Sequence, residues 1–443
     1  MVDDEIAFRS TRGMDVISED ALQIGIAIGR SFDRVAVGID TNPSSDMIRD
    51  ALIAGLTSAG ADVLNVGMAP TPAVCCTMQD SCDCIVMVGE PDISEMVSGI
   101  SMYEPDGTPY SLMHMESLLN NTAPLPDFSG VGDVKNIDCV IRMYMDLMIS
   151  EFDDNEGMIV VDCGCGTAGL TVPGILDAHG ADVVSVNAQT DPGKGRLSPG
   201  IGRARLIALS DIVGCNPDSI GVAINGDGTR IALMDESGKV VDDYMVMALI
   251  LMHMKPDVAV IPIDTPVIVE SAFWGISDQK DGSENNVGRR VIRTEDSIEA
   301  VIKIMKANNA DVGMTSKGCF IFPTNTYCPD GAAAALELSE LSGISNIKRL
   351  IESFPTYISR MERIGFDGNI KSFGRKFTEE VQKYNFSHLS IMDGWRLGVS
   401  GGWVMVSKNK DDSHMLDVTG EAYDGIYLTS MMELVKSIIR SCI

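Results

Sequence analysis

The stretch VAVGIDTNPSSDMIRDALIAGLTSAGADVLNVGM, residues 35–68, contains one complete strand–helix–strand unit. Its first apolar run is rich in β-branched residues, ends at Asp40 and predicts a buried strand. Ser44 or Ser45 is a candidate N-cap of the next helix, because a serine side chain accepts a hydrogen bond from a free N–H of the first turn. Gly60 ends that helix. The apolar residues that fall on one helical face are Met47, Ile48, Ala51, Leu52 and Leu56. The second strand, ADVLNVGM, completes the unit.

The same order of elements recurs twice more along the chain. Apolar runs end at Asp162 (MIVVD) and Asp264 (VAVIPID), and each is followed by a helix, a second strand, another helix and a third apolar run. In every unit the third run ends in a loop of small and polar residues, at positions 89–94, 225–230 and 313–319. Alternating strands and helices indicate parallel sheets, which place ligand sites at the carboxyl ends of their strands. The three loops are therefore expected to line binding surfaces.

The end of the chain has a different pattern. WRLGVS, then Gly401-Gly402, then WVMV predicts a hairpin with a glycine turn. We therefore predict three α/β domains with mixed, mostly parallel sheets at residues 1–148, 149–250 and 251–364, followed by an α+β domain at 365–443.

Composition argues against several classes of partner. The 443 residues include 63 Asp and Glu against 34 Lys and Arg, a formal net charge of -29. This charge repels nucleic-acid backbones and anionic lipid, so neither nucleic acid nor a membrane is an expected partner. No apolar stretch approaches the roughly 20 residues that cross a bilayer, and the first residues, MVDDEIAFRS, are acidic where a signal peptide is basic. We expect a cytoplasmic protein, and the eleven scattered cysteines suit a reducing compartment.

The run from Cys163 to Gly169, CGCGTAG, contains a G-x-G-x-x-G string after a strand. A dinucleotide site also needs an acid at the end of the next strand to bind the ribose, and that strand ends in Asn187. We therefore interpret the string as a tight glycine turn rather than a nicotinamide site.

Five longer strings follow one another along the chain: GIDTNPSSDMIRDALIAGLTSAGADVLNVGMAPTPA from Gly38, VVDCGCGTAGLTVPGIL from Val160, VNAQ from Val186, VAVIPIDTPVIVE from Val258 and CFIFP from Cys319. Through them nearly the whole chain resembles the α-D-phosphohexomutases, the family of phosphoglucosamine mutase and phosphomannomutase, and above all their archaeal members. The resemblance implies a four-domain phosphohexomutase architecture around a central cleft. It also implies an intramolecular phosphotransferase activity, in which a phosphoserine and Mg²⁺ act on a sugar phosphate.

The family's phosphoserine string, TASHNP, is replaced by GEPDIS at residues 89–94. Counting from the preceding strand places Glu90 at the serine position, and counting back from Ser98-Gly99-Ile100 places Pro91 there. Neither side chain has the hydroxyl oxygen that carries a phosphoryl group. The nearest hydroxyl belongs to Ser94, which is also a candidate helix cap. Arg12, in RSTRG, matches the family's amino-terminal arginine beside the cleft.

The family's metal loop, DGDxDR, is similar to Asn225-Gly226-Asp227-Gly228-Thr229-Arg230. Only Asp227 keeps a carboxylate, and Mg²⁺ favours several hard oxygen ligands. We therefore expect no tight Mg²⁺ site and no other cofactor.

The two remaining family loops have also changed. The sugar loop GGExSG corresponds to residues 313–319, where Thr315 replaces the glutamate, and the phosphate loop RPSGTEP corresponds to residues 407–413, where the arginine is lost. Lysines in these loops attract an anion as point charges. The candidate substrate-binding residues are Thr315, Ser316, Lys317, Lys408, Asn409 and Lys410.

All four loops have lost their chemical residues while the surrounding pattern is kept. The leading hypothesis is a catalytically inactive paralogue that binds a sugar phosphate or another small anion and acts as a binding or regulatory subunit. It would be a homo-oligomer or a hetero-oligomer with an active relative. One alternative is a divergent but active mutase that uses Glu90, Asp92 and Asp227 in altered roles, and another is a purely structural subunit. A basic cluster in this acidic chain is a further candidate anion site, or else a solvated loop: Lys194, Arg196, Arg203 and Arg205.

Overall fold

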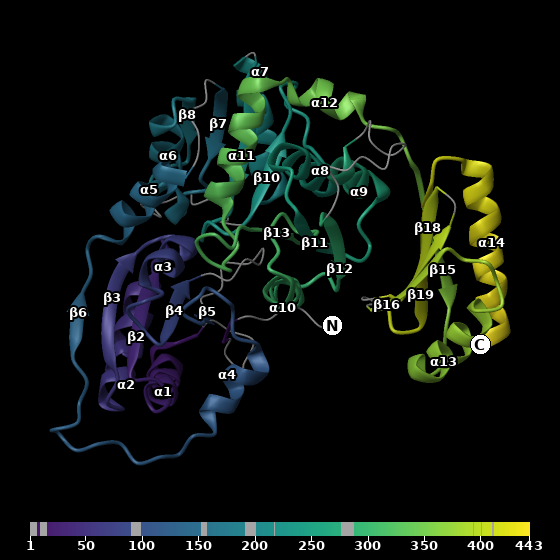
Figure 1. The fold of residues 1–443 in the computed structure, drawn as a ribbon. Helices are drawn as coiled ribbons and strands as arrows, with labels where there is room; N and C mark the ends of the chain where they lie inside the picture. The colour runs from purple at the N-terminus through teal and green to yellow at the C-terminus, as the bar shows by residue number, and fades with distance from the viewer. Residues whose placement is uncertain are drawn as a thin grey trace.

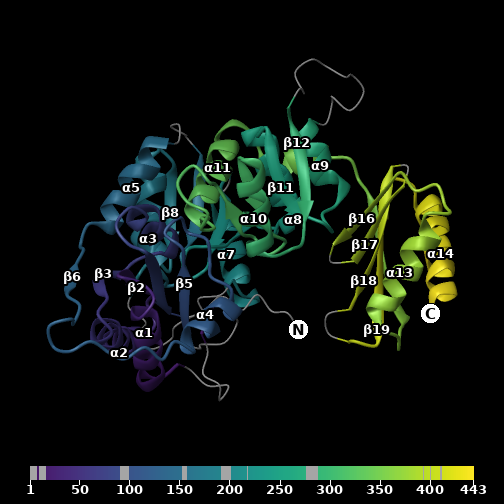
Figure 2. The ribbon, with the colours of Figure 1, turned by 60° about the horizontal axis from the view of Figure 1, so that its bottom comes forward.

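The computed structural model of the chain describes residues 7–8, 16–89, 99–151, 157–190, 201–216, 218–275, 288–392, 394–399, 401–409 and 412–443. Four sheets follow one another along the sequence. In Figures 1 and 2 the first three sheets and their helices form one body, and the fourth sheet lies at one end of it.

The first sheet has the strand order β1-β5-β4-β2-β3-β6, with β2 parallel to β3 and β4 and with β4 antiparallel to β5. Its strands are β1 (Ala7–Phe8), β2 (Arg34–Ile39), β3 (Asp62–Met68), β4 (Cys84–Gly89), β5 (Gly99–Tyr103) and β6 (Val134–Asn136). Its helices are α1 (Ser18–Gly29), α2 (Ser45–Ser58), α3 (Thr71–Met78), α4 (Leu112–Leu119) and α5 (Val140–Glu151). Side chains of β2 alternate between two cores, because Val35 and Val37 pack with α1 and α2 while Ala36 packs with α3.

Two glycines bring α1 and α2 together. A Cβ on Gly25 would lie 2.3 Å from the carbonyl oxygen of Leu52, and one on Gly55 would lie 2.3 Å from that of Leu22. No larger residue fits at either crossing position without a shift of the helices. The predicted start of α2 is confirmed at Ser45, with Ser44 in the N-cap position, although no serine side chain caps the helix there.

The second and third sheets repeat the arrangement of the first. Their strand orders are β10-β9-β7-β8 and β12-β11-β13-β14. The strands are β7 (Met158–Asp162), β8 (Asp182–Val186), β9 (Ile220–Ile224), β10 (Ile231–Met234), β11 (Val258–Pro262), β12 (Arg290–Thr294), β13 (Val312–Met314) and β14 (Phe320–Ile321). In all three sheets the first strand of the unit lies between the second and the third and is parallel to both. The threefold repeat is therefore confirmed, and each unit has an additional antiparallel strand (β5, β10 or β14) that the sequence did not predict.

Two long helices connect the second and third sheets. The helical segments of this region are η1 (Thr167–Leu170), α6 (Val172–Ala178), α7 (Arg203–Cys215), α8 (Asp243–Met254), α9 (Val267–Trp274), α10 (Ile298–Asn308), α11 (Gly331–Ile344) and α12 (Ile347–Ser353). Helix α11 follows the third sheet in sequence but contacts β7, β9 and β10 of the second, and α8 packs against both α9 and α11. Both helices contribute to one apolar core that the two sheets share.

The fourth sheet is antiparallel, with the order β15-β19-β18-β17-β16. Its strands are β15 (Ile358–Gly365), β16 (His388–Met392), β17 (Gly394–Val399), β18 (Gly402–Lys408) and β19 (Met415–Ala422), and α13 (Ile370–Val381) and α14 (Gly425–Cys442) cover one face. The predicted glycine hairpin is confirmed, since Val399 pairs with Gly402. The predicted boundary between residues 364 and 365 is wrong, because it falls inside β15. That edge strand is almost entirely exposed and contains Ser359, Arg360, Glu362 and Arg363, so its sequence resembles a linker.

The other two predicted boundaries fall inside helices, at 148 in α5 and at 250 in α8. Within the part of the chain that the structure describes, no helix has the length and apolar character that crossing a lipid bilayer requires.

Candidate functional site

The third strand of each unit places its predicted loop at an equivalent position. β4, β9 and β13 end at Gly89, Ile224 and Met314, immediately before or within the predicted loops. Glu90, Pro91 and Arg12 lie outside the described residues, so their predicted placement stays a prediction.

Asp40 marks the edge of the first loop. A Cβ on Gly89 would lie 2.4 Å from Cγ of Asp40, so only glycine leaves room for this carboxylate. Asp40 accepts hydrogen bonds from the backbone N–H of Asn42 (2.8 Å) and from Oγ of Ser45 (2.6 Å). The carboxylate is thereby fixed at the carboxyl end of β2.

The loop between β9 and β10 is closed by its own side chains. Nδ2 of Asn225 donates to Oγ1 of Thr229 (3.2 Å), and that hydroxyl donates to Oδ1 of Asp227 (2.7 Å). The backbone N–H of Thr229 also donates to Asp227 (3.0 Å), and that of Arg230 donates to Oδ1 of Asn225 (2.9 Å). Thus the positions that correspond to the three metal-ligating aspartates of the family bind one another.

This arrangement does not fit Mg²⁺. A magnesium site needs several outward oxygen ligands in octahedral geometry, whereas here an amide and a hydroxyl serve as donors within the loop. Of the described residues, no group of three carboxylate, imidazole or thiol ligands gathers at this loop. The carboxylate of Asp227 already accepts hydrogen bonds from the N–H and the hydroxyl of Thr229, which occupy the oxygen that a cation would bind.

The third loop turns its polar groups toward the protein. Thr315 is buried, and its Oγ1 accepts from the N–H of Lys317 (3.4 Å). Both the backbone N–H (2.9 Å) and the hydroxyl of Ser316 donate to Asp296, which lies just beyond the carboxyl end of β12. Only Lys317, among these three candidate residues, is exposed. A bridge between Arg230 and Cys319 brings the third loop next to the second.

The fourth loop begins at the end of β18. Asn409 is buried, and its Nδ2 donates to both carboxylate oxygens of Asp417, at 3.0 and 2.9 Å. Lys408 is exposed, and Lys410 lies outside the described residues. Of the fourth-loop candidates that the structure describes, Lys408 is the one available to an anion.

A cavity of about 440 Å³ separates the third unit from the fourth sheet. Ser407, Lys408 and Asn409 line it, as do Tyr244 and Asp264 from the opposite side. Its volume is within the range of small-molecule sites. Its ionisable lining also includes Asp296, Arg363, Asp417 and Glu421.

Both cations and carboxylates line the cavity. Arg363 and Lys408 supply positive charge, and Arg363 forms an ion pair with Asp417 at 3.3 Å. On the opposite wall the hydroxyl of Tyr244 donates to Oδ2 of Asp264 (3.1 Å), and burial raises the pKa of that tyrosine, so it remains a donor. Tyr244, Asp296, Arg363 and Asp417 were missed from the sequence. Of these, only Asp296 could have been found from the sequence, because it lies just beyond the carboxyl end of a parallel strand, where ligand sites are expected.

Hydrogen bonds between the fourth sheet and residues 263–267 fix one wall of the cavity. Oε2 of Glu421 accepts from Nε1 of Trp403 (2.7 Å) and from the N–H of Val267 (2.7 Å), the first residue of α9. Arg396 donates to the carbonyls of Ile263 and Thr265 (3.0 Å to Thr265) and stacks 4.2 Å from the Trp403 ring centroid. Burial lowers the pKa of Arg396 to about 9, so the guanidinium is still charged at neutral pH.

The basic cluster is not a single surface. Arg205 is buried, and its Nε lies 3.0 Å from Oδ2 of Asp162 in an ion pair. Its guanidinium also donates to the carbonyls of Asp162 (2.9 Å) and Ile224 (2.8 Å). Arg203 is exposed at the start of α7, while Lys194 and Arg196 lie outside the described residues. Arg205 therefore holds two strands together and is not available to an anion.

The glycine string after β7 is packed against protein rather than open to a ligand. A Cβ on Gly164 would lie 2.5 Å from the Arg205 guanidinium, and one on Gly166 would lie 2.5 Å from Gly226. The tight-turn interpretation accounts for these contacts.

Comparisons with known proteins agree with this architecture. The sequence model described as "Phosphoglucomutase/phosphomannomutase, alpha/beta/alpha domain I" matches residues 9–124. The chain is 27% identical to a probable phosphoglucosamine mutase of Methanococcoides burtonii, over 98% of both chains. It is 28% identical to a phosphoglucomutase/phosphomannomutase of Thermococcus kodakarensis, over 90% of both.

Solved structures share the fold. A phosphoglucomutase/phosphomannomutase family protein from Burkholderia thailandensis superposes with a TM-score of 0.75 at 18% identity, over 100% of this chain and 98% of the other. A putative phosphomannomutase from Thermus thermophilus superposes with a TM-score of 0.72 at 16% identity, over 99% of each chain.

Proposed function

Since the chain belongs to the α-D-phosphohexomutase family, we propose that it binds a hexose phosphate without transferring the phosphoryl group itself. The substrate class comes from the relatives, of which several are phosphoglucosamine mutases by name. The absence of transfer is inferred from the residues of this chain.

The observation that carries the proposal is the closed loop between β9 and β10. Phosphoryl transfer develops negative charge that a metal ion and fixed donors must stabilise. Here Asn225, Asp227 and Thr229 hydrogen-bond one another, so the loop offers one carboxylate that is already satisfied. The sequence also has Glu90 or Pro91 where the family carries its phosphoserine.

The cavity beside the fourth sheet supports binding. Lys408 and Arg363 are the cations that a phosphate group would meet, and the carboxylates of Asp264 and Asp296 suit sugar hydroxyls or the ammonium group of an amino sugar. A ligand with both a phosphate and an ammonium group therefore complements a cavity that is lined by both cations and carboxylates. We further propose that such binding serves regulation, with the chain in a homo-oligomer or assembled with a catalytically active relative.

The second candidate is a divergent but active phosphoglucosamine mutase or phosphomannomutase, and the comparisons favour it over the first. The named relatives match across nearly their full length, including all four units. In this candidate Glu90, Asp92 and Asp227 take altered roles.

One set of measurements on the purified full chain separates the candidates. Glucosamine 6-phosphate, glucose 1-phosphate and mannose 1-phosphate are titrated calorimetrically, a coupled assay follows 1-to-6 interconversion, and intact mass reports covalent phosphate. We expect heat with at least one sugar phosphate, no turnover and no added phosphate.

Matched variants locate the binding. Lys408→Met should weaken affinity by about tenfold or more, since a hydrogen bond to a charged group contributes about 1.5–3 kcal/mol. Lys348→Met, which removes an exposed lysine on α12, should not change it. Turnover with a phosphorylated chain would overturn the main proposal in favour of the second candidate. Neither heat nor turnover would indicate a purely structural subunit.

A further inference from the structure

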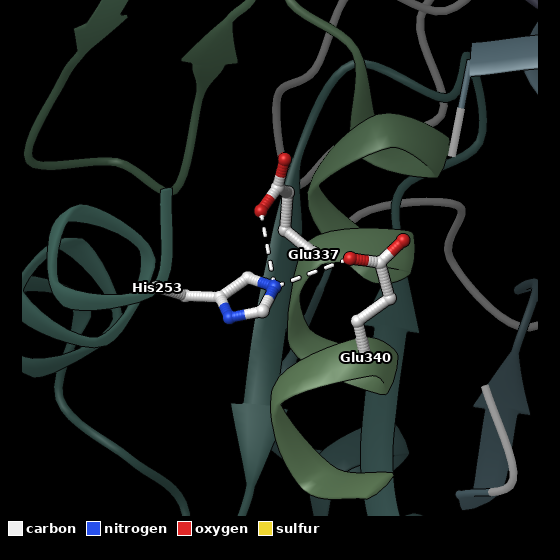
Figure 3. A group of neighbouring side chains, drawn as sticks. All are labelled: His253, Glu337 and Glu340. Atoms are coloured by element: carbon white, nitrogen blue, oxygen red, sulfur yellow. Dashed lines mark hydrogen bonds and ion pairs between the residues drawn. The ribbon is translucent and has the colours of Figure 1, made fainter. Parts of the chain in front are cut away.

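Three metal-ligating side chains converge between α8 and α11, as Figure 3 shows. His253 lies in the last turn of α8, and Glu337 and Glu340 lie about one turn apart on α11. Nε2 of His253 is 3.2 Å from Oε2 of Glu340 and 3.6 Å from Oε2 of Glu337. All three ligand atoms lie within 4.8 Å of one another.

These separations match the dimensions of a metal centre. In a tetrahedral zinc site with bonds of about 2.1 Å, neighbouring ligand atoms lie about 3.4 Å apart. The two nitrogen–oxygen separations, 3.2 and 3.6 Å, are close to that edge length. The third separation, between the two carboxylate oxygens, is no longer than 4.8 Å.

The electrostatics of the group also favour a cation. Oε1 of Glu340 is buried and accepts no hydrogen bond from any residue that the structure describes. The carboxyl end of α8 adds partial negative charge at His253. The charged groups that face the imidazole are the carboxylates of Glu337 and Glu340 and the ammonium group of Lys255.

We propose that His253, Glu337 and Glu340 bind a divalent transition metal ion in a structural site. Nitrogen and carboxylate ligands together suit Zn²⁺, whereas Mg²⁺ prefers oxygen ligands and retains its water. The side chains are 16%, 12% and 18% exposed, so water completes the coordination from the solvent side.

The site is separate from the cavity. His253 follows Tyr244 by nine residues of the same helix, or about 13 Å at about 1.5 Å per residue. The ion connects α8, which packs on α9 of the third unit, to α11, which packs on the second sheet. Its role is to hold these two units together. Since the ion binds the folded chain and its ligand set is dispersed in the unfolded one, it should raise Tm.

The experiment measures Zn²⁺ binding by the full chain after removal of metal with a chelator. Exposed cysteines also bind zinc, so the background carries Cys139→Ser and Cys215→Ser, the two exposed cysteines. We expect one Zn²⁺ per chain by calorimetry and elemental analysis and a Tm that rises with Zn²⁺ but not with Mg²⁺. Co²⁺ should give visible d–d absorption without the near-ultraviolet band of a thiolate ligand.

Variants identify the ligands. His253→Ala and Glu340→Gln should each lower affinity by at least about 100-fold, because even partners outside the ligand shell cost about 10- to 100-fold. Glu340→Gln keeps the side-chain volume and serves if His253→Ala does not fold. His414→Ala is the matched control, because His414 pairs with Asp367 alone in an exposed position. Equal zinc binding by the parent and Glu340→Gln, or a thiolate band with Co²⁺, would overturn the proposal.

Discussion

Replacement of Arg205 by methionine should destabilise the second unit strongly. Arg205 is 2% exposed, and its guanidinium donates to the Asp162 side chain and to the carbonyls of Asp162 and Ile224. Methionine fills much of the volume but leaves Oδ2 of Asp162 without this donor. Oδ1 keeps its bonds from the N–H of Gly164 (2.9 Å) and from Nδ2 of Asn187 (3.0 Å).

The expected loss follows from the charge left behind. Removal of one partner of a buried ion pair costs about 3–5 kcal/mol, because the remaining charge stays buried without compensation. Addition of Asp162→Asn should recover part of this cost, with a coupling between the two positions of about 0.5–3 kcal/mol. Arg203→Met removes an exposed arginine two residues earlier and should change stability by less than about 0.5 kcal/mol.

Urea unfolding followed by circular dichroism gives the stability of each variant, and hydrogen exchange assigns the change to β7 and β9. The test also separates two roles for Arg205. A loss below about 1 kcal/mol would refute the structural role. So would a phosphate-dependent rise in Tm that disappears in Arg205→Met while the stability without phosphate is unchanged, since that result would assign Arg205 to an anion site.

Three other predictions concern the second loop, the cavity wall and the start of α8. The double variant Asn225→Asp with Thr229→Asp should bind Mg²⁺ in a calorimetric titration, because the second loop then has three carboxylates. The control variant Asn120→Asp with Thr122→Asp adds the same charge at the surface and should not bind Mg²⁺. Arg396→Met should increase hydrogen exchange of residues 263–268 at least about tenfold, since two hydrogen bonds of about 1 kcal/mol each are lost, whereas Arg360→Met on exposed β15 should leave it unchanged. Burial raises the pKa of Asp243 to about 6 from 3.8, so the folded state favours its protonated form and stability from this group falls as pH rises from about 4 to 6. The Tm gain of Asp243→Asn over the parent should therefore grow across that range and level off above it, and a gain independent of pH would contradict this reasoning.

The sequence was sufficient for the repeated framework of the fold. Buried parallel strands are continuous apolar runs, and the runs that end at Asp40, Asp162 and Asp264 mark the central strand of each sheet. Of the antiparallel strands that were missed, β14 has only two residues, too few for a periodic pattern. The strand β15 was missed because both of its faces are exposed and carry polar residues. Its sequence therefore has no apolar alternation that would distinguish it from a linker.

Side-chain pairing within the site was not predictable for a different reason. Asp162 and Arg205 are 43 residues apart, and Glu421 meets Val267 across 154 residues. No local pattern specifies such pairs, because they depend on how complete units pack. The sequence therefore identified the loops but not what their side chains bind.

The described loops share one property that explains their chemistry. In the second loop Asp227 is bound by Thr229, in the third Asp296 is bound by Ser316, and in the fourth Asp417 is bound by Asn409. In the last two pairs the carboxylate comes from outside the loop, because Asp296 follows β12 and Asp417 lies on β19. A catalytic loop keeps charged groups unsatisfied for the transition state, which costs stability, so internal pairing of this kind is what the proposed absence of phosphoryl transfer predicts. Each such hydrogen bond to a carboxylate contributes about 1.5–3 kcal/mol net. The proposed binding of a sugar phosphate therefore requires that the ligand replace one of these partners at the cavity, where Asn409 and Asp417 lie in its lining.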